Sequence, residues 1–225
     1  MALVLVPGFM LDDDLWTDMR PEFDRFWPIH AVDPSRARSI EEMAAQALET
    51  APPEFDLLGF SMGGYAARAM QRAAPNRVRR MVLVATSARA GSAFQAQRRA
   101  MVAKSDPALF AGLSRRAISL SLAPERAGDT ALVERIHAMS LRLGGETFRR
   151  QSLFRRDGDL DQLSAIHCPT LIVAGSRDRL RSVEESHEMQ TRIPGSRLAV
   201  LDSGHMIPME APDELSTLLT DFLGT

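Results

Sequence analysis

Short apolar segments alternate with segments of helical periodicity along most of this chain. Alternation of this kind predicts a mostly parallel sheet covered by helices on both faces, which is an α/β fold. The carboxyl ends of parallel strands then meet at one edge, where loops carry binding and catalytic groups. Strands are expected at 2–6, 29–32, 55–58, 81–85, 170–174 and 197–201, and helices at 40–50, 61–74, 183–193 and 213–223.

Residues 88–163 interrupt the alternation. No convincing strand pattern occurs there, whereas helical spacing recurs, for example at Leu132, Ile136 and Met139. Because strands and helices alternate again after this stretch, the simplest organisation is a single domain over residues 1–225, with a helical cap inserted at approximately 88–163.

The composition excludes several classes of protein. A net charge of −2 argues against nucleic acid as a partner, since binding phosphates requires a basic surface. No apolar run approaches the roughly 20 residues of a membrane helix, and the apolar start is too short for a secretion signal. The single cysteine, Cys168, excludes an internal disulfide and suits a reducing compartment, so a cytoplasmic location is expected. No histidine–carboxylate cluster has metal-ligand spacing, and no cofactor is expected.

The segment Gly59-Phe60-Ser61-Met62-Gly63 joins an expected strand to an expected helix. At such a junction, a G-x-S-x-G motif forms a tight turn that exposes the serine hydroxyl at the end of the strand. The Met62 backbone N–H then lies beside the hydroxyl at a helix N-terminus, where it can donate to a developing oxyanion. Ser61 is therefore a candidate nucleophile; the alternative is a structural turn whose glycines only allow close packing.

Five histidines are candidates for the general base that an attacking serine needs. His205 lies in a loop directly after the last expected strand, at the edge where strand ends gather. Histidine is the side chain type whose ordinary pKa lies closest to neutral pH, so an imidazole there can accept the serine proton. We interpret His30, His137, His167 and His187 as packed or solvated side chains.

Asp178 is the candidate acid, because it follows the strand expected at 170–174 by four residues. A carboxylate at this position can fix the histidine tautomer and stabilise the imidazolium. Asp202 is nearer to His205 in the sequence, but it begins the histidine loop and is interpreted as capping or orienting that loop.

Four segments, in this order, resemble the α/β-hydrolase superfamily over nearly the whole chain. They are LVPGF (the oxyanion loop), GFSMGG (the nucleophile elbow), CPTLIVAGSRD (the acid strand) and SGHMIPMEAP (the histidine loop). The resemblance implies the α/β-hydrolase fold, with Ser61 as nucleophile, Asp178 as acid and His205 as base. It also implies an oxyanion hole formed by the backbone N–H groups of Phe9 and Met62.

The sequence departs from the family pattern in three places. Pro7 replaces the usual histidine of the oxyanion loop, AVDPSRARS replaces the glycine-rich loop after the second strand, and the first two strands of the family are expected to be absent. The strand at 29–32 would then be an open sheet edge, which its short length and Pro34 make tolerable. Ser61 separates the chain from haloalkane dehalogenases and epoxide hydrolases, which resemble it but use aspartate. Hydroxynitrile lyases of this fold place a lysine near the histidine loop, whereas the only lysine here is Lys104 in the cap.

The function implied by the resemblance is a serine hydrolase that cleaves a small carboxylic ester or lactone through an acyl-enzyme. An enol-lactone hydrolase, a thioesterase and a cofactor-free perhydrolase are alternatives within the fold. A receptor-like member that binds a ligand with little turnover is an alternative from another class. The oligomeric state and the identity of the acyl and alcohol groups stay open.

Residues 87–159 contain twelve arginines and one lysine against seven acidic residues, a net charge of +6. This excess either favours substrates that bear a carboxylate or reflects solvated helix faces. The acidic run Asp12-Asp13-Asp14 is expected to cap a helix at 15–19 and to have no catalytic role. Apolar cap residues could line an acyl pocket or fasten the cap to the sheet: Phe94, Met101, Leu109, Phe110, Leu113, Ile118, Leu120 and Leu122.

Overall fold

The structure is a computed structural model that describes residues 1–92, 97, 100–102 and 104–224, without the side chains of residues 25 and 26. Within this part of the chain, six parallel strands form one sheet in the order β2-β1-β3-β4-β5-β6. The short strand expected at the open edge is β2. The strands are β1 (Ala2–Val6), β2 (Ile29–Ala31), β3 (Phe55–Phe60), β4 (Val78–Val84), β5 (Thr170–Gly175) and β6 (Arg197–Leu201).

The central strands are apolar along their length because both faces of the sheet are covered. All residues of β3 and β5 are buried. Successive side chains in β1 alternate between two hydrophobic clusters, with Leu3 and Leu5 in one and Val4 and Val6 in the other. The expected α/β fold with a doubly covered parallel sheet is therefore confirmed.

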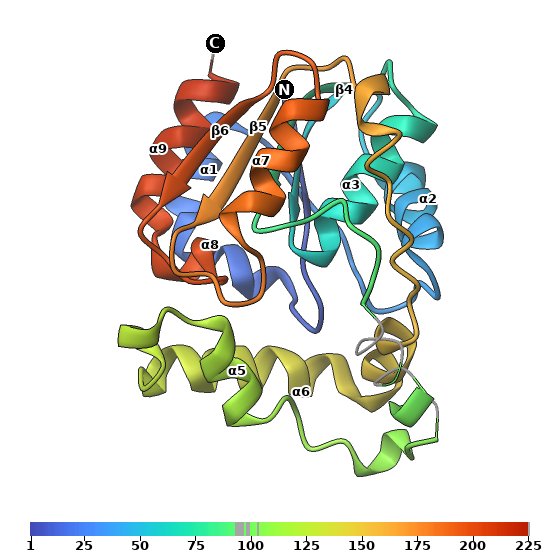
Figure 1. Cartoon of the computed structure of the whole chain (residues 1–225), viewed down its shortest axis with the longest axis vertical. Helices are drawn as coiled ribbons and strands as arrows, with labels where there is room; N and C mark the ends of the chain where they lie inside the picture. Colours follow the sequence, from blue (N-terminus) through green and yellow to red (C-terminus); the bar gives the residue numbers. More distant parts are fainter. Residues whose placement is uncertain (93–96, 98–99, 103, 225) are drawn as a thin grey trace.

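Two groups of helices provide this cover (Figure 1). One face packs against α2 (Ile40–Thr50), α3 (Met62–Ala73) and α7 (Val183–Arg192). The other face packs against the 3-10 helix η1 (Asp13–Met19), α1 (Arg20–Phe26) and α9 (Pro212–Leu223). The helices expected at 40–50, 61–74, 183–193 and 213–223 are all present, with ends within one residue of those expected.

The inserted segment, defined here as residues 85–169 between β4 and β5, lies largely outside these layers. In Figure 1 its helices α5 (Arg115–Ser121) and α6 (Thr130–Ser152) form a separate layer beyond the ends toward which the arrows of β5 and β6 point. The backbone leaves helical geometry at Gly144, where φ is +76°. Within the described residues, no helix is long and apolar enough to cross a membrane. Among the described residues, the inserted segment also contains the 3-10 helices η2 (Pro107–Leu109), η3 (Pro124–Arg126) and η4 (Leu163–Ala165).

The acidic run after β1 has a second role besides capping. As expected, Asp12 caps η1, its side chain accepting a hydrogen bond from the Asp14 backbone N–H. Arg142 of α6 also pairs with Asp12 and Asp14, at 2.7 and 3.0 Å, and Arg135 pairs with Asp14 and Asp18, at 2.9 and 2.6 Å. Although burial alone would raise the pKa of Asp14, hydrogen bonds from the two arginines lower it. Arg135 and Arg142 of the inserted segment thus pair with the acidic loop. The sequence interpretations of this positive charge, as a substrate carboxylate site or as solvated helix faces, did not include such pairing.

A buried ion pair connects α3 to the end of the inserted segment. Arg68 is fully buried, and its guanidinium donates two hydrogen bonds of 2.8 Å to the Asp159 carboxylate. The same guanidinium donates to the Ser87 carbonyl oxygen, at 2.9 Å, and Arg72 also donates to Asp159, at 2.8 Å. These bonds hold α3, the helix that begins directly after Ser61, against the beginning and the later part of the inserted segment.

Candidate active site

Ser61 lies between β3 and α3 in a backbone conformation that few residues adopt, with φ 52° and ψ −111°. A positive φ is uncommon for a residue with a side chain and persists only where its surroundings enforce it. The Ser61 N–H donates to the Val84 carbonyl oxygen, at 2.9 Å, and the Thr86 hydroxyl donates to the Ser61 carbonyl oxygen, at 2.7 Å. The last residue of β4 and Thr86, two residues beyond it, therefore support both the N–H and the carbonyl of the serine.

Two glycines allow this turn to pack against its neighbours. A Cβ at Gly63 would lie 2.2 Å from the Val6 carbonyl oxygen, and a Cβ at Gly59 would lie 2.6 Å from the Gly63 carbonyl oxygen. Both distances are shorter than any real contact, so a larger residue at either position would displace backbone. The close packing that these glycines allow and the position of Ser61 at the turn thus arise from the same backbone geometry.

His205 and Asp178 lie beside the Ser61 hydroxyl, in a hydrogen-bonded chain. His205 Nε2 is 2.8 Å from Ser61 Oγ, and His205 Nδ1 is 2.7 Å from Asp178 Oδ2. The side chains of His205 and Asp178 are 8% and 1% exposed. Because an ionised carboxylate only accepts hydrogen bonds, Nδ1 carries the proton, and Nε2 is left to accept from the serine hydroxyl.

Asp178 is held in place by the loop that follows β5. Its Oδ1 accepts hydrogen bonds from the backbone N–H groups of Leu180, at 2.7 Å, and Arg181, at 2.9 Å. The second oxygen, Oδ2, is thereby turned toward the imidazole of His205. The carboxylate consequently has little freedom to rotate away from the ring.

Glu210, in the short helix α8 (Ile207–Glu210), organises the loop that carries His205. Its carboxylate accepts from the backbone N–H groups of Gly204 and Met206, at 3.2 and 3.1 Å, on either side of the histidine. It also accepts from the Ala123 N–H of the inserted segment, at 2.8 Å. Sequence reasoning missed Glu210, although it lies within the segment that resembles the histidine loop.

The remaining sequence candidates lie in other surroundings. The Asp202 carboxylate is 72% exposed and accepts from Arg177, a hydrogen bond that lowers the pKa of Asp202. Asp178, not Asp202, is therefore the carboxylate that reaches His205. His30 bonds to a hydroxyl at the end of α2, and His137 bonds to a backbone carbonyl of the inserted segment.

Two backbone N–H groups expected to form an oxyanion hole lie near the serine turn. Met62 is the first residue of α3, and Phe9 follows β1 in the loop before η1. In the described part of the chain, neither N–H group is a donor in the backbone hydrogen bonds of turns, loops and helix caps. Their donation to a ligand oxygen above Ser61 stays a prediction.

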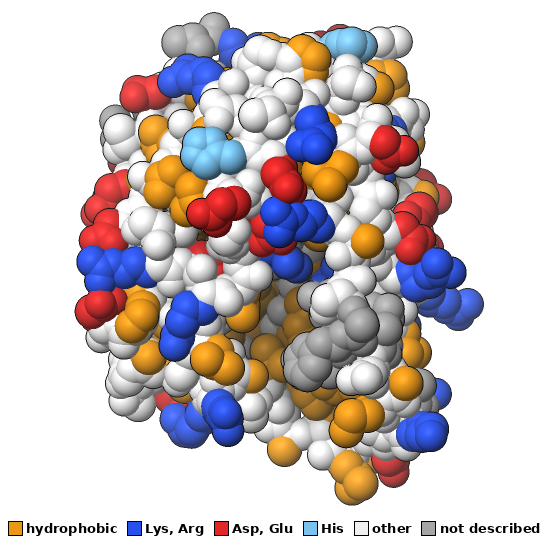
Figure 2. All heavy atoms as spheres, viewed as in Figure 1, with side chains coloured by type: hydrophobic (Ala, Val, Ile, Leu, Met, Phe, Trp, Pro, Cys, Tyr) orange, Lys and Arg blue, Asp and Glu red, His pale blue; other side chains and the backbone are white. Residues whose placement is uncertain are grey.

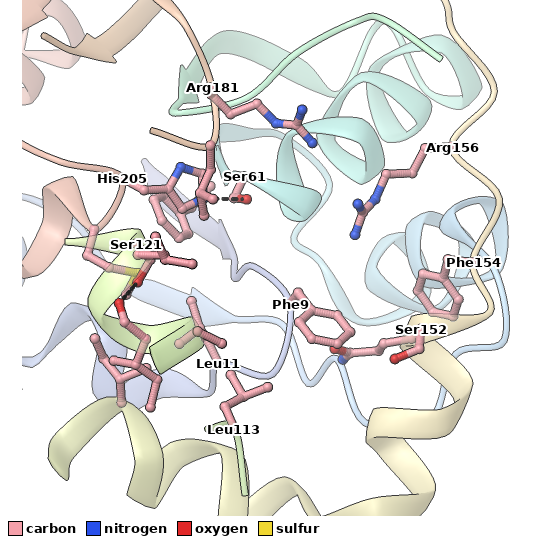
Figure 3. A pocket seen from close by; sticks show the side chains of 18 of the residues that line it. Phe9, Leu11, Ser61, Leu113, Ser121, Ser152, Phe154, Arg156, Arg181 and His205 are labelled. Atoms are coloured by element: carbon pink, nitrogen blue, oxygen red, sulfur yellow. Dashed lines mark hydrogen bonds between the residues drawn. The ribbon is translucent and has the colours of Figure 1, made fainter. Parts of the chain in front are cut away.

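A cavity of about 370 Å³ opens beside Ser61 and His205. Figure 2 shows it as an apolar hollow between the sheet-bearing body and the inserted segment. Figure 3 shows Ser61 and His205 at one side of the cavity, Phe9 and Leu11 on its wall, and two arginine side chains directed into it. Its volume and mostly apolar walls are typical of a small-molecule site.

The inserted segment supplies only some of the expected lining residues. Leu113, Ile118 and Leu120 line the cavity, whereas Leu122 is fully buried in the core. The remaining candidates do not line it: Met101 and Leu109 are largely exposed, Phe110 stacks on Phe148, and Phe94 lies outside the described residues. Among the described residues, no group of three or more His, Cys, Asp or Glu side chains is arranged to hold a metal ion.

Comparison with known proteins places this geometry in a family. A sequence model described as "Alpha/beta hydrolase family" matches residues 3–218. A pimeloyl-[acyl-carrier protein] methyl ester esterase from Salmonella heidelberg is 38% identical over 93 residues, which cover 38% of this chain and 36% of that protein. The matched stretch thus spans about a third of that relative's length.

Solved structures resemble the whole fold. A thermophilic esterase from Thermogutta terrifontis, described as malate bound, has a TM-score of 0.87 and 28% identity, covering 100% of this chain and 89% of its own. An enol-lactonase from Burkholderia xenovorans has a TM-score of 0.85 at 18% identity, covering 99% of this chain and 91% of its own, which supports the fold alone. Because the family model matches nearly the full length, this chain belongs to the alpha/beta hydrolase family.

Proposed function

We propose that the protein is a serine hydrolase that cleaves a small carboxylic ester or lactone through an acyl-enzyme, in a single domain whose inserted segment acts as a cap. The observation that carries the proposal is the hydrogen-bonded chain from Asp178 through His205 to the Ser61 hydroxyl. A serine becomes a useful nucleophile when an adjacent base accepts its proton and a third group orients that base. The order and spacing of these groups support that role.

The reaction then follows from the geometry. Ser61 Oγ attacks the ester carbonyl carbon while its proton passes to His205 Nε2, and Asp178 stabilises the resulting imidazolium. The Phe9 and Met62 N–H groups donate to the oxyanion of the tetrahedral intermediate. His205 returns the proton to the leaving alkoxide, which departs as an alcohol. Water, deprotonated by the same imidazole, cleaves the acyl-enzyme to a carboxylate and regenerates the serine.

The substrate class is supported by the cavity and by the relatives. A volume of about 370 Å³ suits a small acyl ester. The Thermogutta terrifontis structure is an esterase, and the Salmonella heidelberg relative is a methyl ester esterase. Thioester, enol-lactone and perhydrolase activities use the same nucleophile, so a substrate panel separates them. A cytoplasmic location and the absence of a cofactor stay predictions from the sequence.

Covalent labelling tests the proposal against a receptor-like role. We expect a fluorophosphonate probe to attach one label per chain, mapped to Ser61 by peptide mass spectrometry, because His205 activates only that hydroxyl. The same preparation should hydrolyse p-nitrophenyl acetate and simple lactones. Heat-unfolded protein is the control for nonspecific labelling. An unlabelled Ser61 in folded protein, together with no turnover of any ester, lactone or thioester, would instead support ligand binding without catalysis.

A further inference from the structure

The cavity wall carries two guanidinium groups and, among the described residues that line it, no carboxylate. Arg181 lies in the loop that follows Asp178, and Arg156 lies in the inserted segment after α6. Figure 3 shows both side chains directed into the space beside Ser61. Two segments on opposite sides of β5 in the sequence therefore bring positive charge to one part of a mostly apolar cavity.

Arg181 retains capacity to bind a ligand. Its guanidinium lies 3.6 Å from the Glu185 carboxylate, which is longer than an ordinary hydrogen bond, and its side chain is 18% exposed. The other oxygen of Glu185 accepts from the Ser182 backbone N–H, at 3.0 Å. A guanidinium has several N–H donors in a planar fork, and one distant carboxylate cannot occupy all of them.

We propose that this cavity selects substrates that carry a carboxylate in addition to the ester, so that half-esters of dicarboxylic acids are the substrate class. The inference rests on the proposed function: the ester carbonyl lies at Ser61 Oγ, and the free carboxylate pairs with Arg181 and Arg156. Arginine matches a carboxylate with paired N–H donors, and the attraction is stronger between apolar walls than in water. Arg142, whose positive charge pairs with Asp12 and Asp14, has no part in this selection.

Matched substrates and variants test the proposal. Monomethyl glutarate and monomethyl adipate are compared with methyl pentanoate and methyl hexanoate, which have similar length and no second carboxylate. For the wild type we expect kcat/KM at least about 10-fold higher for the half-esters. Arg181→Gln and Arg156→Gln should each lower it about 10- to 100-fold for the half-esters and leave the neutral esters within about threefold. Arg155→Gln is the control, because that side chain is 80% exposed and pairs with Asp157.

Each outcome bears on the proposal. Equal kcat/KM for half-esters and neutral esters in the wild type would overturn it, and so would an equal loss on both substrates in Arg181→Gln, since that indicates disturbed structure. A half-ester preference that the two arginine variants leave intact would assign selectivity elsewhere. Failure of the proposed function is distinguishable, because then neither substrate class reacts and Ser61 takes no fluorophosphonate label.

A separate observation concerns the loop that carries the Phe9 N–H. Gln151, near the end of α6, is 1% exposed and bridges two loops of the body. Its Oε1 accepts from the Met10 backbone N–H, at 2.8 Å, and its Nε2 donates to the Pro34 carbonyl oxygen, at 3.0 Å. Met10 has a φ of +58°, a conformation that its surroundings must hold. We infer that Gln151 is a positioning residue for the Phe9 oxyanion donor.

Kinetics of Gln151 variants test this second inference. Gln151→Met removes both hydrogen bonds at similar volume, and Gln151→Glu removes the donor to Pro34. We expect kcat to fall about 10- to 100-fold with KM within about threefold, because a displaced donor weakens binding of the oxyanion more than binding of the substrate. Gln46→Met, in α2 away from the cavity, is the control. A lower Tm with unchanged kcat for the folded protein would contradict the inference and indicate a structural role only.

Discussion

Ser61→Ala is expected to reduce kcat for ester hydrolysis by about 10⁶-fold. The loss follows because the acyl-enzyme cannot form without the Oγ that lies 2.8 Å from His205 Nε2. Alanine removes one oxygen and leaves the hydrogen bond from the Ser61 N–H to Val84 in place, so Tm should change little. Progress curves with p-nitrophenyl acetate, recorded at high enzyme concentration, measure the loss.

The control for this experiment is Ser176→Ala, which removes an exposed hydroxyl that bonds to Asp202 and should keep full activity. If Ser61→Ala retained more than a tenth of the wild-type kcat, another nucleophile or a directly activated water would be required. The acyl-enzyme mechanism would then be wrong, although the fold would be unaffected.

Asp178→Asn is expected to lower kcat by about 10⁴-fold while the protein stays folded. The asparagine oxygen can still accept from the Leu180 and Arg181 N–H groups, as Oδ1 does now. Its NH₂ group then faces His205 Nδ1 and donates to it. The proton is thereby forced onto Nε2, and the imidazole can no longer accept the proton of Ser61.

Asp202→Asn provides the matched control, since this carboxylate is closer to His205 in the sequence but is exposed and paired with Arg177. We expect its kcat to remain within about twofold of the wild type, as is usual for an exposed pair distant from the reaction. Equal losses in the two variants would show that the assignment of the acid to Asp178 is wrong. Initial rates over a range of ester concentrations separate kcat from KM for both proteins.

Most of the architecture could be predicted because it depends on local patterns. Buried parallel strands are continuously apolar, so β3 and β5 were recognisable without knowledge of their neighbours. The turn at Ser61 between β3 and α3 was likewise predictable, because its backbone conformation depends on only a few neighbouring residues. Chain order then indicated which loops reach the same edge of the sheet, and the short distances among Ser61, Asp178 and His205 agree with that expectation.

The residues that sequence reasoning missed share one physical property. Glu210 and Gln151 act through hydrogen bonds to backbone groups, and backbone groups carry no sequence signature. The excess charge of the inserted segment was visible, but its distribution was not. Arg135 and Arg142 bind acidic residues of the body, whereas Arg156 and Arg181 line the cavity.

By itself the sequence determined the order of strands and helices, the strained serine turn and the identity of the candidate triad, because these follow from periodicity, glycine positions and chain order. Only the tertiary structure decided which arginines enter the cavity and which side chains fasten the inserted segment to the rest of the chain. Those outcomes depend on contacts between segments that the sequence separates, such as the bond between Met10 and Gln151, which are 141 residues apart. Many polar side chains in the sequence could make such contacts, and only the packing of the folded chain selects among them.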